Sequence, residues 1–453
     1  MTSTWSFAQA DSRNYARVLL IFLFFINLLN YVDRLVISGL LEPIRKDFGL
    51  NDAQLGTIAL AFLVPYTLLP PVVGWIGDRA RRTTLISMAI GVWSFATGAA
   101  GLALGFRTLA ATRAVVGVGE ATYMTSAPSL IADIFPPGKR GAAMSLFYMA
   151  SPVGAGLGVT LGGLIAAAYG WRTACMVVGI PGIVMALIML FTAEPRRGRF
   201  DPQQASERPP LANAFRALIR NRPFLLLVVA YTFQTLSYNP IEFWVPTILQ
   251  RDKGISLVQA SATYGAVVFV AGLLGPLVGG LLGDLLAKRK PSAYYSISAL
   301  SSLACIVPLL AIAMLSRGIP LFVALFGEIF LGNMSTGLVF AILVAIVIPG
   351  LRGTATAVIL TVIHLLGDGI SQPLIGWIST QLSVGSPLSG VLQRVGDALH
   401  VPAGSHLSLA LVSVSLPATV MAAGLYALAA QRRNHAAPAQ ENPLLVTDQD
   451  HRF

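Results

Sequence analysis

Charged residues are scarce in this sequence. Asp, Glu, Lys and Arg make up 11% of its 453 residues, whereas a soluble globular domain carries about 25%. Hydrophobic residues reach 55% and the mean hydropathy is +0.71. This composition excludes a soluble enzyme or binding domain and indicates a polytopic membrane protein. The net charge of +11 does not predict nucleic-acid binding, because the basic residues are spread between the apolar runs instead of forming one patch.

Cysteine is nearly absent as well. Cys175 and Cys305 are the only two, and each lies inside an apolar run. Two isolated thiols argue against a disulfide framework or a thiolate metal site, so we expect both to be packing residues. The phosphate-binding pattern Gly-x-x-x-x-Gly-Lys-Ser/Thr is missing too, which argues against an ATP-driven pump. We expect no cofactor and no metal, and an ion gradient as the energy source.

Long apolar runs are what the sequence has instead. About 20 residues of helix cross the hydrocarbon core, and a span exposed to lipid must be helical because lipid offers its backbone no other partners. We predict an all-α membrane protein with twelve spans, at about 18–41, 53–77, 84–105, 107–132, 142–168, 174–193, 223–249, 258–287, 292–315, 320–347, 354–381 and 405–430.

The distribution of Lys and Arg predicts the orientation. With both termini in the cytoplasm, the inside segments hold 21 of these residues and the outside loops hold 8, as the positive-inside rule requires. The long inside segment around Pro209-Pro210 is interpreted as a linker between two six-helix halves. The predicted divisions are an N-terminal bundle (1–195), a linker (196–222), a C-terminal bundle (223–431) and a disordered cytoplasmic tail (432–453).

The end of the linker has one apolar and one basic helical face. This pattern predicts a short helix that lies on the cytoplasmic membrane surface, with a disordered basic linker as the alternative. The apolar residues are Leu211, Phe215, Leu218 and Ile219, and the basic ones are Arg216 and Arg220.

The two halves share a repeated motif. The second run closes with Gly74-Trp75-Ile76-Gly77-Asp78, and the eighth closes with Gly280-Leu281-Leu282-Gly283-Asp284. A weak internal repeat of this kind is typical of transporters built from two pseudo-symmetric halves.

These motifs resemble those of a known family. The loop Gly74-x-x-x-Asp78-Arg79-x-x-Arg82 and the run Arg113-x-x-x-Gly117-x-Gly119-Glu120 resemble signatures of the major facilitator superfamily. More specific motifs resemble its spinster-like branch: Asn30-Tyr31-x-Asp33-Arg34, the segment from Gly117 to Tyr123, the glycine series from Phe147 to Gly158, and His364-Leu365-Leu366-Gly367-Asp368. The resemblance implies the major facilitator fold and transport of lysolipids or sphingolipid phosphates with proton coupling.

An acid and a guanidinium stand side by side in the first run. A charge in mid-membrane costs at least about 2.5–3.5 kcal/mol on insertion scales, so Asp33 and Arg34 each need a partner or water. In the fourth run, Arg113 and Glu120 are seven residues apart and share a helix face. Adjacent residues point about 100° apart, so only one of Asp33 and Arg34 can face the cavity squarely. We expect Arg34 to face Glu120, and Asp33 to pair with Arg113 or lie at the helix edge.

Carboxylates outnumber cations within the spans. The five acids are Asp33, Glu120, Glu242, Glu328 and Asp368, against Arg34 and Arg113. Desolvation favours neutral acids whereas a neighbouring Arg favours ionised ones, so some of the five must be protonated or open to water. A proton on Glu120 or Asp33 would free Arg34 for an anionic headgroup, which predicts proton coupling. The alternative is a structural ion network that holds the first and fourth helices together.

Other polar residues in the spans are weaker candidates. His364 and Asp368 are four residues apart and form either a second proton relay or a packing pair. The candidate cavity residues are Asn30, Tyr123, Tyr231, Gln234, Tyr238, Glu242 and Asn333. For the seventh helix, where Pro240 should break or kink the chain, the alternative is interhelical hydrogen bonding.

The motif loop predicts a cytoplasmic gate. Gly74 allows close packing, and Asp78 can meet the N-terminal end of a facing helix. Arg79 and Arg82 can pair with Asp133, and Asp284 is the equivalent of Asp78 in the second half. The alternative is that these charges only enforce topology.

The sequence therefore predicts a secondary transporter that works by alternating access and is not an enzyme. The expected substrate is an amphipathic anionic lipid, of the lysophospholipid or sphingoid phosphate class. The alternative is a proton-coupled transporter of small organic anions or drugs on the same fold. We expect a monomer in the cell (inner or plasma) membrane, in contact with membrane lipids and with no nucleic-acid partner.

Overall fold

The fold is described by a computed structural model that covers residues 13–200, 211–290 and 292–436. Within these ranges the chain is almost entirely helical and contains no strand. The N-terminal half comprises α2 (Arg13–Phe48), α3 (Asp52–Leu68), α4 (Pro70–Gly77), α5 (Arg82–Ala100), α6 (Phe106–Ile134), α7 (Pro137–Tyr169) and α8 (Trp171–Leu190). The C-terminal half comprises α10 (Arg222–Arg251), α11 (Leu257–Ala287), α12 (Ala293–Met314), α13 (Ile319–Ile346), the short η1 (Pro349–Leu351), α14 (Arg352–Val362), the π-helix η2 (Ile363–Asp368), α15 (Gly369–Ser383), α16 (Pro387–Ala398) and α17 (His406–Ala436).

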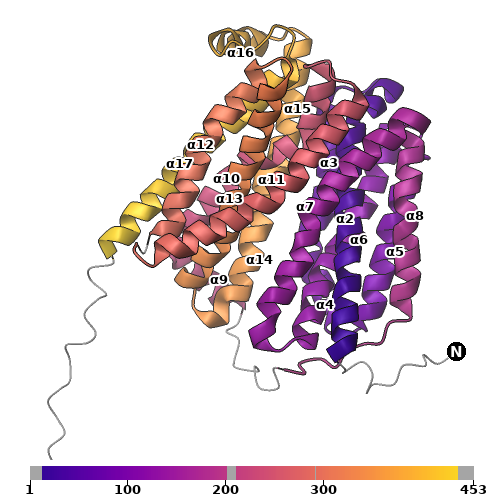
Figure 1. The fold of residues 1–453 in the computed structure, drawn as a ribbon, viewed down its shortest axis with the longest axis vertical. Coiled ribbons are helices and arrows are strands. Elements are labelled where there is room, and N and C mark those ends of the chain that lie inside the picture. The colour runs from indigo at the N-terminus through magenta and orange to yellow at the C-terminus, as the bar shows by residue number, and fades with distance from the viewer. Residues whose placement is uncertain (1–12, 201–210, 291, 437–453) are drawn as a thin grey trace, which may run out of the picture.

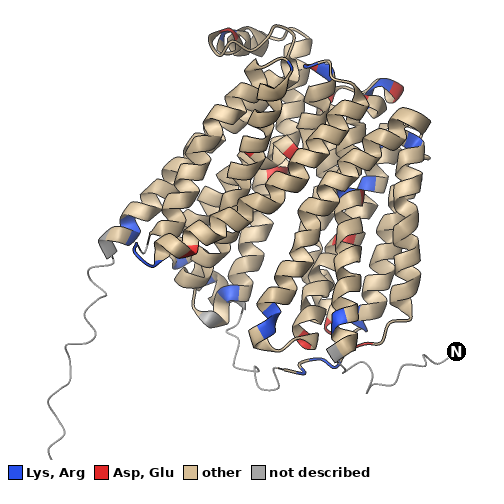
Figure 2. Cartoon of the chain, viewed as in Figure 1, with Lys and Arg blue, Asp and Glu red and all other residues tan. Residues whose placement is uncertain are grey.

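Two bundles lie side by side, with the N-terminal half in indigo to magenta and the C-terminal half in pink to yellow (Figure 1). We call the end that carries α9 (Leu211–Arg220) the inner end, and the end that carries α16 the outer end, following the orientation that Lys and Arg predict. The described chain begins and ends at the inner end. Most charged residues lie at the two ends, and a few lie inside the bundles (Figure 2).

Ten of the described helices are long and apolar enough to cross a membrane, and the bent pair α3 and α4 makes eleven. The remaining predicted span, α6, does not pass this test, because it carries Arg113 and Glu120 among glycines, serines and threonines. It nevertheless packs along α3 and α5 as a span would. The count of twelve therefore stays a prediction at α6.

Small residues let the helices approach closely. A Cβ added at Gly158 would lie 2.6 Å from the carbonyl oxygen of Val32, so α7 and α2 are in backbone contact there. Gly156 lies against the carbonyl of Gly265 on α11, which joins the two halves. Cys175 and Cys305 are free and buried among these helices, in keeping with their expected packing role.

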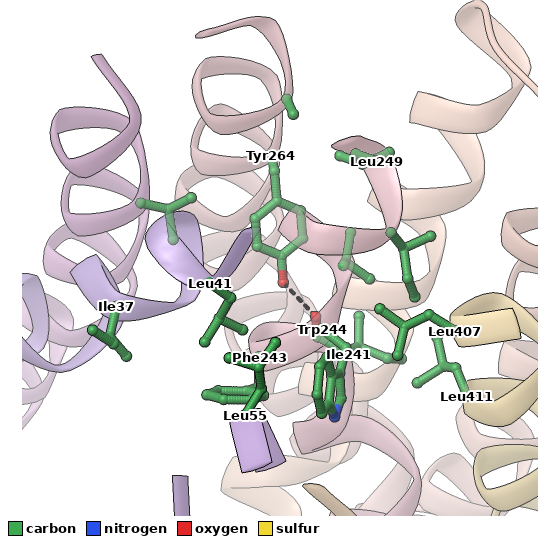
Figure 3. Packing of buried hydrophobic residues seen from close by; sticks show 14 of the residues in the cluster. Ile37, Leu41, Leu55, Ile241, Phe243, Trp244, Leu249, Tyr264, Leu407 and Leu411 are labelled. Carbon is green, nitrogen blue, oxygen red and sulfur yellow. Dashed lines mark hydrogen bonds between the residues drawn. The ribbon is translucent and has the colours of Figure 1, made fainter. Parts of the chain in front are cut away.

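The hydrophobic core joins the halves at one end only. One large cluster combines residues of α2 and α3 with residues of α10, α11 and α17. Figure 3 shows part of it, with Leu41 and Leu55 of the first half beside Phe243 and Trp244 of the second. Two other large clusters lie toward the inner end, and each of them belongs to a single half. The ribbons of the halves also diverge toward α4, α9 and α14 (Figure 1). The halves are therefore packed together at the outer end and separate at the inner end.

The predicted effect of Pro240 was a break or a kink in its helix. α10 runs unbroken through Pro240, so the break is absent. The break occurs in the second span, where α3 and α4 are bent by 41° at Leu69, just before Pro70. The predicted linker helix is present as α9, with Leu218 buried and Ile219 exposed. The predicted disordered tail (432–453) is wrong at its start, because α17 continues to Ala436. Residues 437–453 and the linker residues 201–210 lie outside the described chain.

Candidate functional site

Arg34 and Glu120 form a buried ion pair between α2 and α6. The Nε and Nη2 atoms of Arg34 donate to Oε2 of Glu120 at 2.8 and 2.7 Å. Glu120 is fully buried, whereas 17% of the Arg34 side chain is exposed. The contact that helical geometry predicted across these two helices is therefore present, with Arg34 as the partner closer to solvent.

Aromatic rings surround the guanidinium group of Arg34. Its central carbon lies 4.8 Å from the ring centroid of Tyr31, 5.1 Å from that of Phe62 and 4.5 Å from that of Tyr66. Arg113 lies 5.1 Å from the same Phe62 ring. Each contact is within the range of a cation–π interaction. The rings can hold Arg34 in place when its carboxylate partner is neutral.

Asp33 does not pair with Arg113, and it does not lie at the helix edge. Its Oδ2 accepts a hydrogen bond of 2.9 Å from the indole Nε1 of Trp93 on α5, and only 1% of the residue is exposed. Arg113 instead donates to the backbone carbonyls of Asp33 and Arg34, at 3.5 and 3.4 Å. Because Asp33 points about 100° away from Arg34 around α2, it faces α5.

Several buried polar atoms around this pair have no hydrogen-bond partner within the described chain. They include Asp33 Oδ1 and Arg113 Nε, whereas the Asn30 side chain is a hydrogen-bond partner of Glu120. Leaving a buried polar group unpaired costs about 1–3 kcal/mol. An acid that keeps a carboxylate oxygen unpaired inside the protein, as Asp33 does, is suited to taking up a proton.

His364 and Asp368 also form the expected pair, at 2.7 Å between Nδ1 and Oδ2. The structure adds two features that the sequence did not indicate. The pair lies in the π-helix η2, and Asn239 of α10 donates to the other oxygen of Asp368. π-Helical turns inside longer helices occur frequently at functional sites.

One contact links this pair to the N-terminal half. The ring of Tyr66 on α3 meets the ring of His364 edge to face, with centroids 5.6 Å apart and planes at 81°. Tyr66 also contacts Arg34. One tyrosine therefore contacts both the Arg34–Glu120 pair of the N-terminal half and the His364–Asp368 pair of the C-terminal half.

Most of the candidate cavity residues serve packing in this conformation. The Tyr123 hydroxyl donates to the carbonyl of Leu23, and the residue is fully buried. Gln234 bonds Gly332 and Tyr426, and Tyr238 bonds Asn333 at 2.5 Å. Tyr231 is buried against Phe340. The polar face of α10 therefore forms interhelical hydrogen bonds, which was the alternative to a role in the substrate cavity. Glu242 is half-buried, and Asn30 is fully buried.

The predicted cytoplasmic gate is only partly assembled. Arg82 bonds Asp133 at 2.5 Å, as expected, and also Glu194 at 2.9 Å. Arg79 turns back onto Trp75, with its guanidinium carbon 4.2 Å from the ring. The exposed Asp78 carboxylate contacts no facing helix in the described chain, and Asp284 bonds Tyr294 of its own half. These residues do not bridge the halves here, because the inner ends are apart.

An ion cluster at the outer end does bridge the halves, and the sequence reasoning missed it. Arg251 of α10 donates to Glu42 of α2 at 2.8 Å and to both oxygens of Asp52 on α3, at 2.7 and 2.8 Å. Ser379 of α15 donates to Asp52 at 2.7 Å, and the amide of Ala53 donates to the Thr380 hydroxyl at 3.0 Å. No single segment carries a motif for this cluster, because its members come from four helices.

Comparison with known proteins identifies the relatives of this chain. The sequence profile of the Major Facilitator Superfamily matches residues 23–371. The chain is 34% identical over 400 residues to protein spinster homolog 1 of Xenopus laevis, covering 83% of this chain and 75% of that protein. It is 35% identical over 383 residues to spinster homolog 1 of Homo sapiens, covering 79% and 72%. A crystal structure of a bacterial homolog of the human lysosomal transporter spinster, inward-facing and unoccupied, matches with a TM-score of 0.78 at 26% identity, covering 94% of this chain and 98% of that one.

Proposed function

The chain belongs to the major facilitator superfamily and, within it, to the spinster-like membrane transporters; from this we propose that it moves an amphipathic anionic lipid in exchange for, or together with, protons. The proposed substrate class is a lysophospholipid or a sphingoid phosphate. The observation that carries the proposal is the buried ion pair between Arg34 and Glu120, whose arginine is the partner closer to solvent.

Proton and substrate meet at Arg34. While Glu120 is ionised, it occupies two donors of the guanidinium group. A proton on Glu120 removes the negative charge that faces Arg34, and Arg34 is then free to bind the anionic headgroup. A guanidinium group binds carboxylate and phosphate oxygens with charge-assisted hydrogen bonds, which are about twice as strong as neutral ones. Asp33 lies next to Arg34 in the chain and holds an unpaired oxygen that can take the proton.

The C-terminal half offers a second polar group. His364 is hydrogen-bonded to Asp368 through Nδ1, which leaves Nε2 as the ring nitrogen available to a ligand. His364 would face the headgroup from the half opposite Arg34. Binding to both groups would draw the halves together at the inner end, which alternating access requires.

The outer and inner clusters would then act in turn. In the described conformation Arg251 joins the halves at the outer end. Release of this cluster would open the outer end, while the motif loop around Asp78 and Arg82 would meet the second half and close the inner end. Such exchange between two packed states is how a two-half transporter gives its central site access to each side in turn.

A transporter of small organic anions on the same fold is the second candidate. The face of α10 around Gln234 and Tyr238 favours it, because side chains that bond the neighbouring helix leave less room for an acyl chain. For the membrane itself we propose the cell (inner or plasma) membrane, and for the assembly a monomer.

Reconstitution tests both candidates. Purified protein in liposomes would be given an imposed pH gradient and screened with labelled lysophosphatidate, sphingosine phosphate and small organic anions. We expect gradient-dependent movement of the single-chain phosphates. Transport of only the small anions would overturn the lipid assignment, and transport that ignores the pH gradient would overturn proton coupling.

A further inference from the structure

Tyr66 contacts a polar or charged group of each half. The central carbon of the Arg34 guanidinium group is 4.5 Å from its ring centroid, and the ring of His364 is 5.6 Å away. Phe62, one turn earlier on α3, stacks on Tyr66 at 5.3 Å and 22°. The ring therefore contacts Arg34, His364 and Phe62 at once.

Tyr66 also marks the inner end of the seam between α3 and the helices that face it. Going inward along α3, Ala53 bonds Thr380, Gly56 lies against Gln372 and Pro373, and Leu60 lies against Gly369. Tyr66 meets His364 next in this series. Beyond it α3 ends at Leu68, and α4 turns away by 41°. Among the contacts described along this seam, the one at Tyr66 is the innermost.

The other two rings near Arg34 do not lie at the inner end of this seam. Tyr31 lies on α2 itself, and Phe62 is buried in the core of the N-terminal half. Of the rings around Arg34, Tyr66 is the one for which the described structure shows a ring contact with the opposite half. Its movement would expose Arg34 toward the inner end and would at the same time release His364.

We propose that Tyr66 is a displaceable gate whose ring fills the headgroup position between Arg34 and His364 in the empty transporter. An anionic headgroup displaces the ring and is held by Arg34 from one half and His364 from the other. The exchange is favourable because a guanidinium group binds an anion more strongly than it binds an aromatic face. The ligand class in this inference rests on the proposed function. The shielding of Arg34 by the Tyr66 ring is independent of the proposed function.

Two readouts test the gate. The first needs no substrate: the rate at which phenylglyoxal modifies Arg34 in the purified full-length protein, resolved by mass spectrometry, with the buried Arg113 as the internal reference. The second is the affinity for lysophosphatidate, a single-chain lipid with a phosphate monoester. The variants are Tyr66→Ala, Tyr66→Leu and Tyr66→Phe. Tyr169→Ala, which removes an exposed tyrosine at the outer end of α7, is the matched control.

We expect Tyr66→Ala and Tyr66→Leu to speed modification of Arg34 several-fold. They should also lower the dissociation constant for lysophosphatidate by about threefold to fivefold. This is the change in affinity that corresponds to the free energy of one cation–π contact. Tyr66→Phe keeps the ring but loses the hydroxyl that hydrogen-bonds Arg34, so it should lie between the wild type and Tyr66→Leu, whereas Tyr169→Ala should match the wild type in both readouts.

Unchanged modification of Arg34 in folded Tyr66→Ala and Tyr66→Leu would overturn the gate, and so would weaker lysophosphatidate binding in both. If Tyr66→Ala does not fold, Tyr66→Leu, which keeps most of the volume, decides alone. If no variant and no wild-type sample binds lysophosphatidate, the proposed lipid substrate fails. The modification rates then still decide whether Tyr66 shields Arg34.

Discussion

Asp33 and Arg34 are neighbours in the chain, but their side chains contact different helices. Arg34 faces Glu120 on α6, and Asp33 faces Trp93 on α5. Helical geometry was enough to predict the first contact, because the direction of a side chain on a helix follows from its position. The second could not be predicted, since nothing in the segment around Trp93 shows that its indole meets an acid 60 residues earlier in the chain.

Arg34→Lys tests the need for a guanidinium group. Lysine keeps the charge, but it lacks the planar fork that contacts Glu120 through two nitrogens and packs among three rings. We expect the affinity for a lipid phosphate to fall about tenfold or more, which corresponds to about 1.4 kcal/mol or more. Equilibrium binding to protein in nanodiscs measures this. Arg172→Lys, at the outer end of the same half, is the control, and equal losses in the two variants would contradict a specific role for Arg34.

Lys253, in the loop between α10 and α11, gives the stability of the protein a pH dependence. Burial lowers the pKa of Lys253 to about 8, while nearby Asp252 opposes the shift. In the unfolded chain a lysine has a pKa of about 10.4, so between these values the unfolded state binds more protons. The stability should therefore rise with pH from about 8 to 10. Thermal unfolding across this pH range measures the effect, and Lys253→Met should make the stability nearly independent of pH. If the stability of Lys253→Met rises with pH as steeply as that of the wild type, Lys253 is not the cause.

At the scale of elements, small residues bring the backbones of the two halves into contact at points of the seam such as Gly56 and Gly156. The glycines of α7 could be recognised from the sequence as sites of close approach. The positions of the bends could not, because a proline is tolerated inside a membrane helix when neighbouring groups satisfy the freed carbonyl. α10 therefore continues through Pro240, whereas the second span is broken just before Pro70. The π-helix at His364 has no proline signal at all.

Gly56→Ala should weaken the outer seam. A Cβ at this position would lie 2.7 Å from the carbonyl oxygen of Gln372 and from Cα of Pro373, so α3 and α15 must move apart. We expect a larger fraction of outward-open molecules, measured by the distance distribution between spin labels on the outer ends of α3 and α15. Gly98→Ala, where a Cβ would meet nothing within 4 Å, is the control. An unchanged distribution in Gly56→Ala would show that the seam accommodates the methyl group.

Arg251→Gln should open the same end by a different route. Arg251 is the cation that joins Glu42 and Asp52 of the first half to α10, and 25% of its side chain is exposed. Its loss leaves Asp52 without a cation, whereas Glu42 keeps Arg45 and Lys46, and should cost the closed state about 1–3 kcal/mol, roughly a fivefold to 150-fold shift in the equilibrium. A disulfide trap between cysteines at positions 53 and 380 measures closure and should form more slowly. Arg172→Gln removes an ion pair within one half, and if it slowed the trap equally, the effect would not belong to the bridge.

At the scale of the whole molecule, the positions of the hydrophobic clusters show which end of the two halves is closed. A core shared by both halves at the outer end, with separate cores at the inner end, is an inward-facing arrangement. The sequence predicted two halves and their family, because hydropathy and motifs are properties of single helices. It could not predict the state, since the inward-facing and outward-facing forms are built from the same helices. For the same reason the bridge at Arg251 was missed, whereas the pair formed by Arg34 and Glu120 lies within one half and was predicted.

The central claim of this account is that a proton on Glu120 releases Arg34 for an anionic substrate. The most direct test compares lysophosphatidate transport by wild type and Glu120→Gln in liposomes, with and without an imposed pH gradient. Glu328→Gln, a change at a buried carboxylate of the other half, is the control. We predict that the gradient accelerates the wild type and Glu328→Gln, while Glu120→Gln, permanently neutral at this position, responds much less, because only Asp33 is left to take up a proton beside Arg34. A full response to the gradient in Glu120→Gln would contradict the claim.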